Sequence, residues 1–389
     1  MRSPWTVIMN TWPYSPEEIE RAVAPLTGWA DRIVGTELGV WHRPFPALTL
    51  STELEVSGEW TGSFRTHYDR LMRREKRSDT ARVLLLEGNE VIRRMDLGRL
   101  EELTDGFEAA HRLCFVTSAD DPGKKEIRIL KPSRWHGFSG VYKPDPYPEL
   151  AAFCENMGDS GVRIFRSDED RQPWAEKIEK IMLKNPPNPL ARVRWFVESR
   201  QFAQGLRVLK KHAARNIESA RDYVEWKTLM AEILLGMNKP LEALQALTPL
   251  MSVSPTADRG YLMGRGLYEI GRYDEASAHF FQAGTGMLGE RDCQESGSDS
   301  YRALLWAAHS FLMANRPKDS FGVLKRLLES YPFFQDGWIL FFRLFTGATP
   351  QELYEIITQF LPSRSLYEVF ERMEGLDQEG GGFRQWILH

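Results

Sequence analysis

The sequence predicts two architectures in one chain: a mostly parallel α/β domain first, and an all-α helical-repeat domain after it. Three observations support this. A strand, a helix and a second strand follow one another before residue 37; an apolar run closes on acids and a glycine near residue 87; and from Trp174 onward strand signals stop while helix–turn–helix patterns recur. Strand–helix–strand units build parallel sheets, and recurring helix pairs stack into arrays. We place the domains at 1–170 and 171–347, with 348–389 as a helical cap and tail.

Composition limits the class of protein. A chain of 389 residues holds about two to three domains, and 42% apolar with 27% charged residues is typical of a globular protein. A net charge of −4 gives no general basic surface for nucleic acid. Three separated cysteines indicate neither a disulfide framework nor a zinc site. Without a long apolar run or the apolar core of a signal peptide, we expect no membrane segment and a cytoplasmic protein.

The first elements are well marked. Residues 6–9 form an apolar strand that closes on Asn10 and Thr11. Ser15 is a helix N-cap, followed by proline and two acids, which is a typical helix start. A second strand at 31–36 is tipped by Glu37. Together they predict a βαβ unit.

The central strand is expected at residues 82–86. Glu87, Gly88, Asn89 and Glu90 follow it, and ligands bind beyond the carboxyl ends of strands in open α/β sheets. Glu87, Asn89 and Glu90 are therefore expected to face a site; the alternative is an ordinary polar turn. We also expect helices at 64–76 and 97–110, strands at 113–116, 126–130 and 162–165, and irregular structure over 40–62.

This order of motifs resembles a family-two glycosyltransferase of GT-A fold, in particular the subgroup with a C-terminal tetratricopeptide repeat tail. The family's second strand reads like D-E-I-V-V-V-D-T-G and its fourth ends in L-D-A-D-E. Here residues 31–39 read D-R-I-V-G-T-E-L-G and residues 86–90 read L-E-G-N-E. The later R-L-F-R and G-x-V-H-E are similar to residues 128–131 and 140–143. The resemblance covers about residues 5–170.

The resemblance implies a nucleotide diphosphate sugar, such as a UDP-sugar, as donor. Asn10 and Thr11 would lie near the base, and Glu37 would replace an aspartate that contacts the base or ribose; the alternative for Glu37 is a solvated turn acid. Glu87 and Asn89 take the place of the aspartate pair that holds Mg²⁺ or Mn²⁺ against the diphosphate. Oxygen ligands suit these cations, but an amide binds them more weakly. A domain that binds a nucleotide without turning it over is therefore the alternative.

A carboxylate that acts as general base must reach the acceptor proton. Glu90 is one candidate, and Asp120 or Asp121 is the other, although an Asp-Asp-Pro-Gly run is also ordinary turn chemistry. His136 is a further candidate catalytic residue, which either contacts phosphate or takes the place of the metal-side histidine that the resemblance implies; the alternative is a polar surface residue. Basic residues either offset the diphosphate charge or form a solvated strand face; these are Lys124, Lys125, Arg128, Lys131 and Arg134.

The second half repeats a helix–turn–helix pattern. Residues 268–276 read Y-E-I-G-R-Y-D-E-A, very like the turn of a tetratricopeptide repeat. Arg200, Asn238, Gly271 and Asn315 occupy equivalent turn positions with spacings of 38, 33 and 44, and such a position favours glycine or asparagine in a left-handed conformation. The array is expected to offer a concave surface to a protein. Its candidate lining residues, which are alternatively core, are Trp226, Tyr261, Tyr268, Trp306 and Phe311.

The combined expectation is a glycosyltransferase that moves a sugar to a macromolecular acceptor. A polypeptide side chain is favoured because of the repeats, and a modified nucleic-acid base is the weaker alternative given the net charge. In the resembling transferases the repeat tail either positions a polypeptide acceptor or mediates dimerisation, so a protein partner or a homodimer is expected here. The rival hypothesis is an interaction scaffold with a degenerate transferase domain.

Overall fold

The computed structural model describes residues 5–10, 16–26, 29–36, 54–56, 71–72, 82–87, 90–94, 112–118, 125–130, 138–139, 145–146, 155–166, 189–213, 220–288, 297–332, 334–372 and 383–388. The chain forms two compact units. One unit comprises Met1–Pro148 and Cys154–Glu198, and the other comprises Glu149–Phe153 and Ser199–His389. The domain boundaries expected from the sequence remain a prediction.

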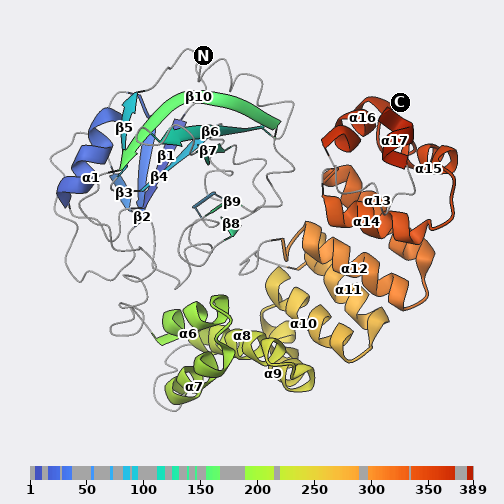
Figure 1. Cartoon of the computed structure of the whole chain (residues 1–389). Helices are drawn as coiled ribbons and strands as arrows, with labels where there is room; N and C mark the ends of the chain where they lie inside the picture. Colours follow the sequence, from blue (N-terminus) through green and yellow to red (C-terminus); the bar gives the residue numbers. More distant parts are fainter. Residues whose placement is uncertain are drawn as a thin grey trace. The chain divides into compact units, whose positions relative to one another are not determined.

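The first unit is built around an eight-stranded sheet with the order β3-β2-β1-β4-β7-β6-β10-β5 (Figure 1). Its elements are β1 Trp5–Asn10, α1 Pro16–Val23, the 3-10 helix η1 Ala24–Leu26, β2 Arg32–Thr36, β3 Leu54–Val56, β4 Arg82–Glu87, β5 Glu90–Arg94, β6 Arg112–Ser118, β7 Lys125–Leu130, β10 Glu155–Arg166 and α6 Pro189–Glu198. Two short strands, β8 Phe138–Ser139 and β9 Asp145–Pro146, pair with each other.

The sheet is mostly parallel, as expected, with β7 and β5 as its two antiparallel strands. β1 pairs in parallel with β2 and β4, and β2 with β3. β7 is antiparallel to both β4 and β6, so β4 and β6 run in the same direction, and β10 is parallel to β6. β5 runs antiparallel to β10. The parallel βαβ unit of β1, α1 and β2 is confirmed, as is the central strand β4.

Three expectations need correction. β3 lies within the stretch expected to be irregular. Glu90 does not belong to a polar tip after β4, because it is the first residue of β5. The last strand was expected at 162–165, but β10 begins at Glu155. The expected helices at 64–76 and 97–110 lie outside the described residues, except for the helical residues 71–72.

The centre of this sheet is a dry core. Val7, Ile8 and Met9 of β1 are fully buried, beside the buried leucines at 84–86 of β4. A long apolar run that is buried on both faces is what a central parallel strand requires. At the amino ends of the strands, the Trp5 N–H donates to Asp31 Oδ2 at 2.7 Å, and the Asp31 N–H donates back to the Trp5 carbonyl at 3.0 Å. This double link fixes where β2 starts beside β1.

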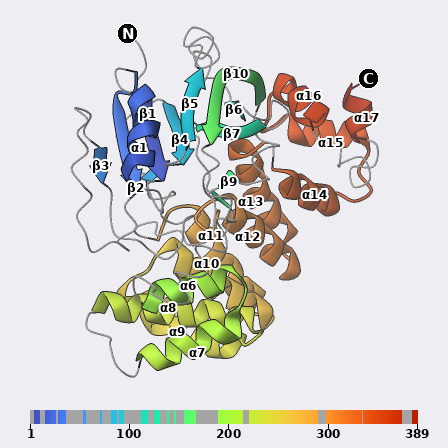
Figure 2. The same ribbon diagram turned by 60° about the vertical axis from the view of Figure 1, so that its left-hand side comes forward.

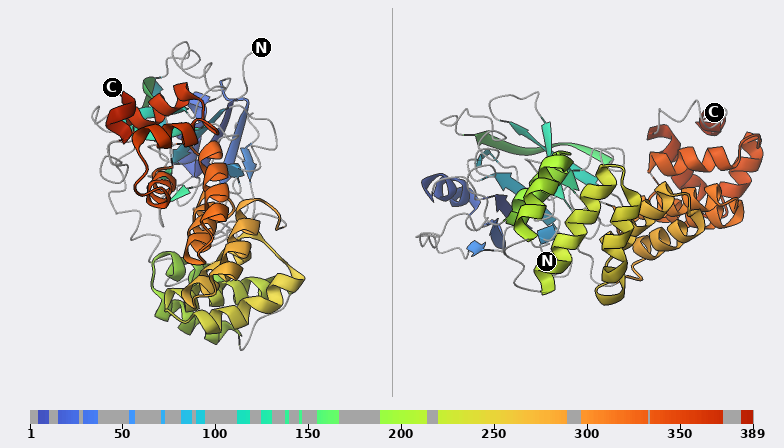
Figure 3. Two further views of the ribbon diagram at one scale, coloured as in Figure 1. Left: turned by 90° about the vertical axis from the view of Figure 1, so that its right-hand side faces the viewer. Right: turned by 90° about the horizontal axis from the view of Figure 1, so that it is seen from below.

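The second unit is a run of helices in which each helix from α7 to α14 contacts the next (Figure 3). The helices are α7 Phe202–Ala213, α8 Ala220–Gly236, α9 Pro240–Val253, α10 Ala257–Glu269, α11 Tyr273–Gly284, α12 Tyr301–Met313, α13 Pro317–Ser330, α14 Gln335–Leu344, α15 Pro350–Ile357, α16 Ser363–Arg372 and α17 Phe383–Leu388. A structure in which neighbours along the chain are also neighbours in space is typical of helical repeats.

One turn geometry recurs after α6, α8, α10 and α12. The residues expected to be equivalent all have a positive φ: 56° at Arg200, 58° at Asn238, 80° at Gly271 and 58° at Asn315. After the last three, the next N–H donates to a carbonyl five residues back, at 2.8 Å for Lys239, 2.9 Å for Arg272 and 2.8 Å for Arg316. This bond is the signature of a Schellman helix end. The prediction of a left-handed turn position is confirmed.

Small residues and aromatic rings hold the hairpins together. A Cβ on Gly264 of α10 would lie 2.8 Å from three ring atoms of Phe280 in α11, so only glycine allows this close approach. The Phe280 ring lies 5.4 Å from Tyr261 and 6.0 Å from Trp306 of α12. Tyr261 is 3% exposed, so it is core and does not line a surface. The other four aromatic residues singled out from the sequence are half-buried.

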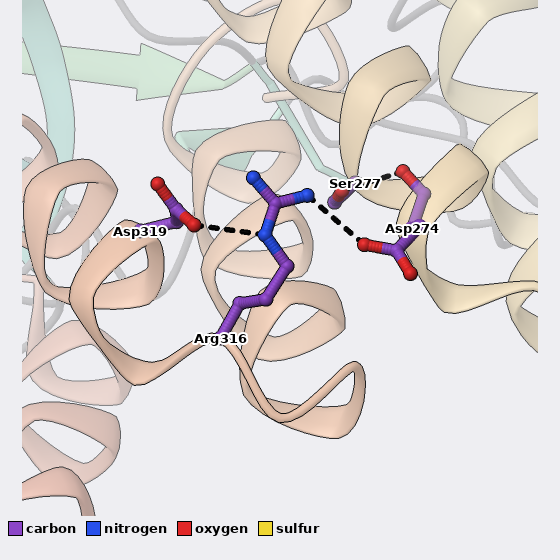
Figure 4. Close-up of polar contacts among 4 residues, drawn as sticks. All are labelled: Asp274, Ser277, Arg316 and Asp319. Carbon is purple, nitrogen blue, oxygen red and sulfur yellow. Dashed lines mark hydrogen bonds and ion pairs between the residues drawn. The ribbon is translucent and has the colours of Figure 1, made fainter.

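Exposed ion pairs form at three of the repeated turns, where α9, α11 and α13 begin. The Arg316 guanidinium, at the start of α13, bonds Asp319 Oδ2 through Nε at 2.8 Å and Asp274 Oδ1 of α11 through Nη1 at 2.9 Å (Figure 4). Lys239 and Arg272 precede their helices in the same way and pair with Glu242 and Glu275. These pairs are exposed and each adds little stability, but their recurrence supports the equivalence of the turns.

Candidate functional site

Polar strand ends meet at the carboxyl edge of the sheet. Asn10, the last residue of β1, pairs in register with Thr36 at the end of β2 and with Glu87 at the end of β4. These three residues therefore occupy one row across three adjacent parallel strands. Neighbouring strands lie about 4.8 Å apart, so the row spans about 10 Å. Asn10 and Glu87, separated by seventy-seven positions in the sequence, become direct neighbours.

The sheet reverses its order at this row. The chain proceeds from β1 outward to β2 and β3, and then returns to place β4 on the other side of β1. The order β3-β2-β1-β4 matches the first four positions of the strand order 3-2-1-4-5-6 of a doubly wound α/β sheet. In such sheets, ligands bind outside the carboxyl ends of the strands at the point of reversal. Here that point lies between Asn10 and Glu87.

Glu90 is brought to the same edge from the far side of the sheet. Only two residues separate Glu87 from Glu90, and three Cα–Cα steps of 3.8 Å span at most about 11 Å. Yet β5, which begins at Glu90, pairs with β10, and Glu90 lies opposite Arg166. The end of β10 must therefore approach the end of β4, and β5 also contacts α1 (Figure 2).

The predicted site residues divide into two groups. Asn10, Glu87 and Glu90 lie in described strands, and the backbone brings them to one edge. The remaining residues, Thr11, Glu37, Asn89, Asp120, Asp121 and His136, lie outside the described residues. Thr11 directly follows Asn10 in the chain, and Glu37 follows Thr36. Within the part of the chain that the structure describes, no group of three His, Cys, Asp or Glu residues is arranged to hold a metal.

Arg166 is a residue that sequence reasoning missed. Its position opposite Glu90 places a guanidinium-bearing residue at the edge where the acids gather. The only signal for it was the expected strand at 162–165, which ends one residue earlier. Pairing between strands that lie about seventy residues apart cannot be inferred from a local pattern.

A half-buried polar cluster lies in the helical unit. The hydroxyl of Tyr268 (α10) is 3.0 Å from Nδ1 of His309 (α12), and the Tyr268 ring lies 5.2 Å from that of Trp306. Burial lowers the pKa of His309, and the charge of Arg343 lowers it further. Burial also raises the pKa of Tyr268, with a smaller contribution from Tyr273. The cluster favours a neutral imidazole and links two successive helix pairs.

Comparisons with known proteins add little. No protein-family model matches the sequence, and no curated protein matches it. Among solved structures, the crystal structure of S. aureus TarS is similar with a TM-score of 0.29 and 10% sequence identity, over 72% of this chain and 55% of that chain. The chain thus spans about half the length of that neighbour, and a TM-score this low carries no argument.

The fold places the chain among α/β proteins with an appended helical array. Its α/β unit carries polar residues at the strand ends where the strand order reverses. None of the helices within the described residues is long and apolar enough to cross a membrane.

Proposed function

We propose that the protein is a cytoplasmic glycosyltransferase that moves a sugar from a nucleotide diphosphate sugar, such as a UDP-sugar, to a macromolecular acceptor. The observation that carries the proposal is the register of Asn10 with Glu87 at the point where the strand order reverses. A nucleotide site is expected at that point. The polar residues that the sequence resemblance assigns to the donor fall on the same strand ends or within two residues after them.

Each residue then has a role. The base and ribose are assigned to Asn10, Thr11 and Glu37. Asn10 ends β1, Thr11 follows it, and Glu37 follows β2. Glu87 and Asn89 end or follow β4 and belong to the diphosphate. Glu90 opens β5 within about 11 Å of Glu87, which suits a general base on the acceptor side. Asp120 or Asp121, after β6, is the other candidate base, and His136 is a candidate phosphate contact.

A divalent cation is compatible with the donor atoms at this position. The Glu87 carboxylate and the Asn89 amide oxygen are hard ligands of the kind that Mg²⁺ or Mn²⁺ takes. Such an ion, when bound, neutralises charge that develops on a departing diphosphate. With one carboxylate in the pair, the protein is expected to hold the ion weakly, and basic side chains are expected to share the task.

The helical unit is proposed to be a tetratricopeptide-like array that presents a polypeptide acceptor or binds a protein partner, including a second copy of the chain. Its recurring left-handed turns and its stacking of neighbours support this assignment. Half-buried aromatic residues on α8 and α12, among them Trp226 and Trp306, offer contact area to a peptide.

Thermal melting of the full chain tests the proposal. A ligand that binds only the folded state stabilises it by about 2.7 kcal/mol at a hundred times its dissociation constant. We expect one nucleotide diphosphate sugar from a panel to raise the melting temperature, more strongly with Mn²⁺ than without. Glu87→Ala should remove the Mn²⁺-dependent part, whereas Glu329→Ala, an exposed glutamate of α13, should not. If no nucleotide shifts the wild-type protein, the transferase is refuted and the rival protein-interaction scaffold is favoured.

A further inference from the structure

Basic residues line up across the strands that complete the sheet. Lys125 (β7) pairs in register with Thr117 (β6), Thr117 pairs with Arg163 (β10), and Arg163 pairs with Arg94 (β5). These four positions, called the basic row below, form one transverse line over four strands. Three of the four carry a positive charge and none carries a negative one.

The β10–β5 pairing makes the row unusual. Arg166 lies opposite Glu90, so this pair combines one positive and one negative residue and has no net charge. Arg163 lies opposite Arg94, which places two like charges directly across from each other. Like charges directly opposite each other destabilise a sheet, and a bound anion would relieve that repulsion. The ladder also advances one residue on β10 but two on β5 at this point, so Arg93 is the extra residue of a bulge and adds a further basic group.

The basic row borders the candidate site. β6 and β10 run in the same direction as β4, so Thr117 and Arg163 lie near the edge where Glu87 ends its strand. β7 is antiparallel to β4 and begins at Lys125, so Lys125 lies toward the carboxyl end of β4. At about 4.8 Å a strand, the row extends about 14 Å across the sheet. The acids of the site and the basic row therefore lie toward the same edge of one sheet.

β-Bulges are common beside functional sites because they redirect a side chain and end regular pairing. Arginine and lysine are also the residues that recognise phosphate, arginine through its planar fork and lysine as a point charge. A pair of opposed arginines with a bulged third arginine suits a doubly charged oxyanion better than it suits an uncharged sugar.

We propose that the basic row binds a phosphate group, with Arg94 and Arg163 as its centre and Lys125 at its β7 end. The phosphate comes either from the diphosphate of the nucleotide donor or from a phosphate carried by the acceptor. That choice of source rests on the proposed function, whereas the anion site itself does not. If the phosphate belongs to the donor, the positive charge of the basic row makes up for the weak binding of the cation expected at Glu87 and Asn89.

The test uses the full chain and three probes: inorganic phosphate, UDP and uridine. Melting temperature is measured against the concentration of each probe at constant ionic strength, held with chloride. The variant is the double substitution Arg94→Gln with Arg163→Gln. The control is Arg207→Gln, an exposed arginine of α7. Lys125→Gln, a single change of charge, repeats the test if the double variant melts much lower without ligand.

We expect phosphate to stabilise the wild-type and control proteins, and the double variant to need at least ten times more phosphate for the same shift. If the phosphate belongs to the donor, saturating UDP abolishes the phosphate shift and the double variant binds UDP, but not uridine, more weakly. If it belongs to the acceptor, the UDP and phosphate shifts add, and UDP binding is unchanged in the variant.

The proposal is overturned if phosphate does not shift the wild-type protein, or shifts the double variant as much as the control. Either result leaves the proposed function standing when UDP still binds. Conversely, a phosphate shift that depends on Arg94 and Arg163 without any binding of UDP supports the basic row and excludes a UDP-sugar as the donor.

Discussion

Gly271 offers a test of the repeated turn in which steric clashes play no part. Its φ is 80°, and a Cβ added to it would meet no atom within 4 Å. Gly322, inside α13, also has nothing within 4 Å of an added Cβ, but its φ is that of a helix. Alanine at the two positions therefore differs in backbone conformation and not in crowding.

The magnitudes follow from that difference. A left-handed conformation costs an alanine about 1–2 kcal/mol, offset by about 0.4–1 kcal/mol because the unfolded chain becomes less flexible. Gly271→Ala should therefore lower the free energy of unfolding by about 0.5–1.5 kcal/mol. Gly322→Ala should raise it by about 0.5–1 kcal/mol, since alanine is the better helix former.

Urea unfolding followed by circular dichroism at the helix band measures both changes. The two midpoints should move in opposite directions from that of the wild type. Arg200→Gly provides a third arm, because relief of a positive φ of 56° should raise stability. If Gly271→Ala is as stable as Gly322→Ala, the left-handed turn does not constrain the sequence and the reasoning fails.

Three further outcomes are expected. Gly264→Ala should cost about 1–2 kcal/mol in the same urea assay, because the added methyl group meets the buried Phe280 ring; an unchanged midpoint would show that the ring moves freely. Since the folded-state pKa of His309 is lowered, the unfolded chain binds a proton first as the pH falls below the ordinary value of 6.5, so stability is complete above that pH and declines on acidification. His309→Gln should make the decline between about pH 7 and pH 5.5 shallower, and Tyr268→Phe should retain it; an unchanged slope in His309→Gln would exclude this imidazole as a source. Glu87→Ala should abolish sugar transfer to any acceptor that the wild type modifies, with the far-ultraviolet spectrum unchanged, and full activity would remove Glu87 from the site.

The parts of the fold that the sequence predicts are those whose signals are local. β1 and β4 are apolar runs with polar ends, and α1 has an N-terminal proline followed by acids. The turns of the helical unit were found because left-handed backbone selects for Asn and Gly, and the pattern extended even to Arg200. Each of these features can be recognised within a window of about ten residues.

The features that were missed depend on distant partners. β5 contains Glu90, Arg93 and Arg94, and its polar pattern does not suggest a strand until β10 is present to pair with it. For Tyr261 the sequence left both a surface and a core position open, because an aromatic residue on a helix has no fixed side; its burial follows from Phe280 on the next helix. His309 gave no signal, since its contact with Tyr268 joins two helix pairs.

The pairing of β5 with β10 also sets the order in which the molecule can be assembled. During synthesis β5 emerges about seventy residues before its partner, so the strand that begins at Glu90 stays without its ladder until β10 has left the ribosome. Pairings between distant strands form slowly, because closing the long loop costs conformational entropy before any contact stabilises the pair. The helices from α8 to α14 contact their neighbours in the chain and face no such delay. The helical unit is therefore expected to fold fast once it is synthesised, and the edge of the sheet with Glu87 and Glu90 to be the last part of the first unit to form.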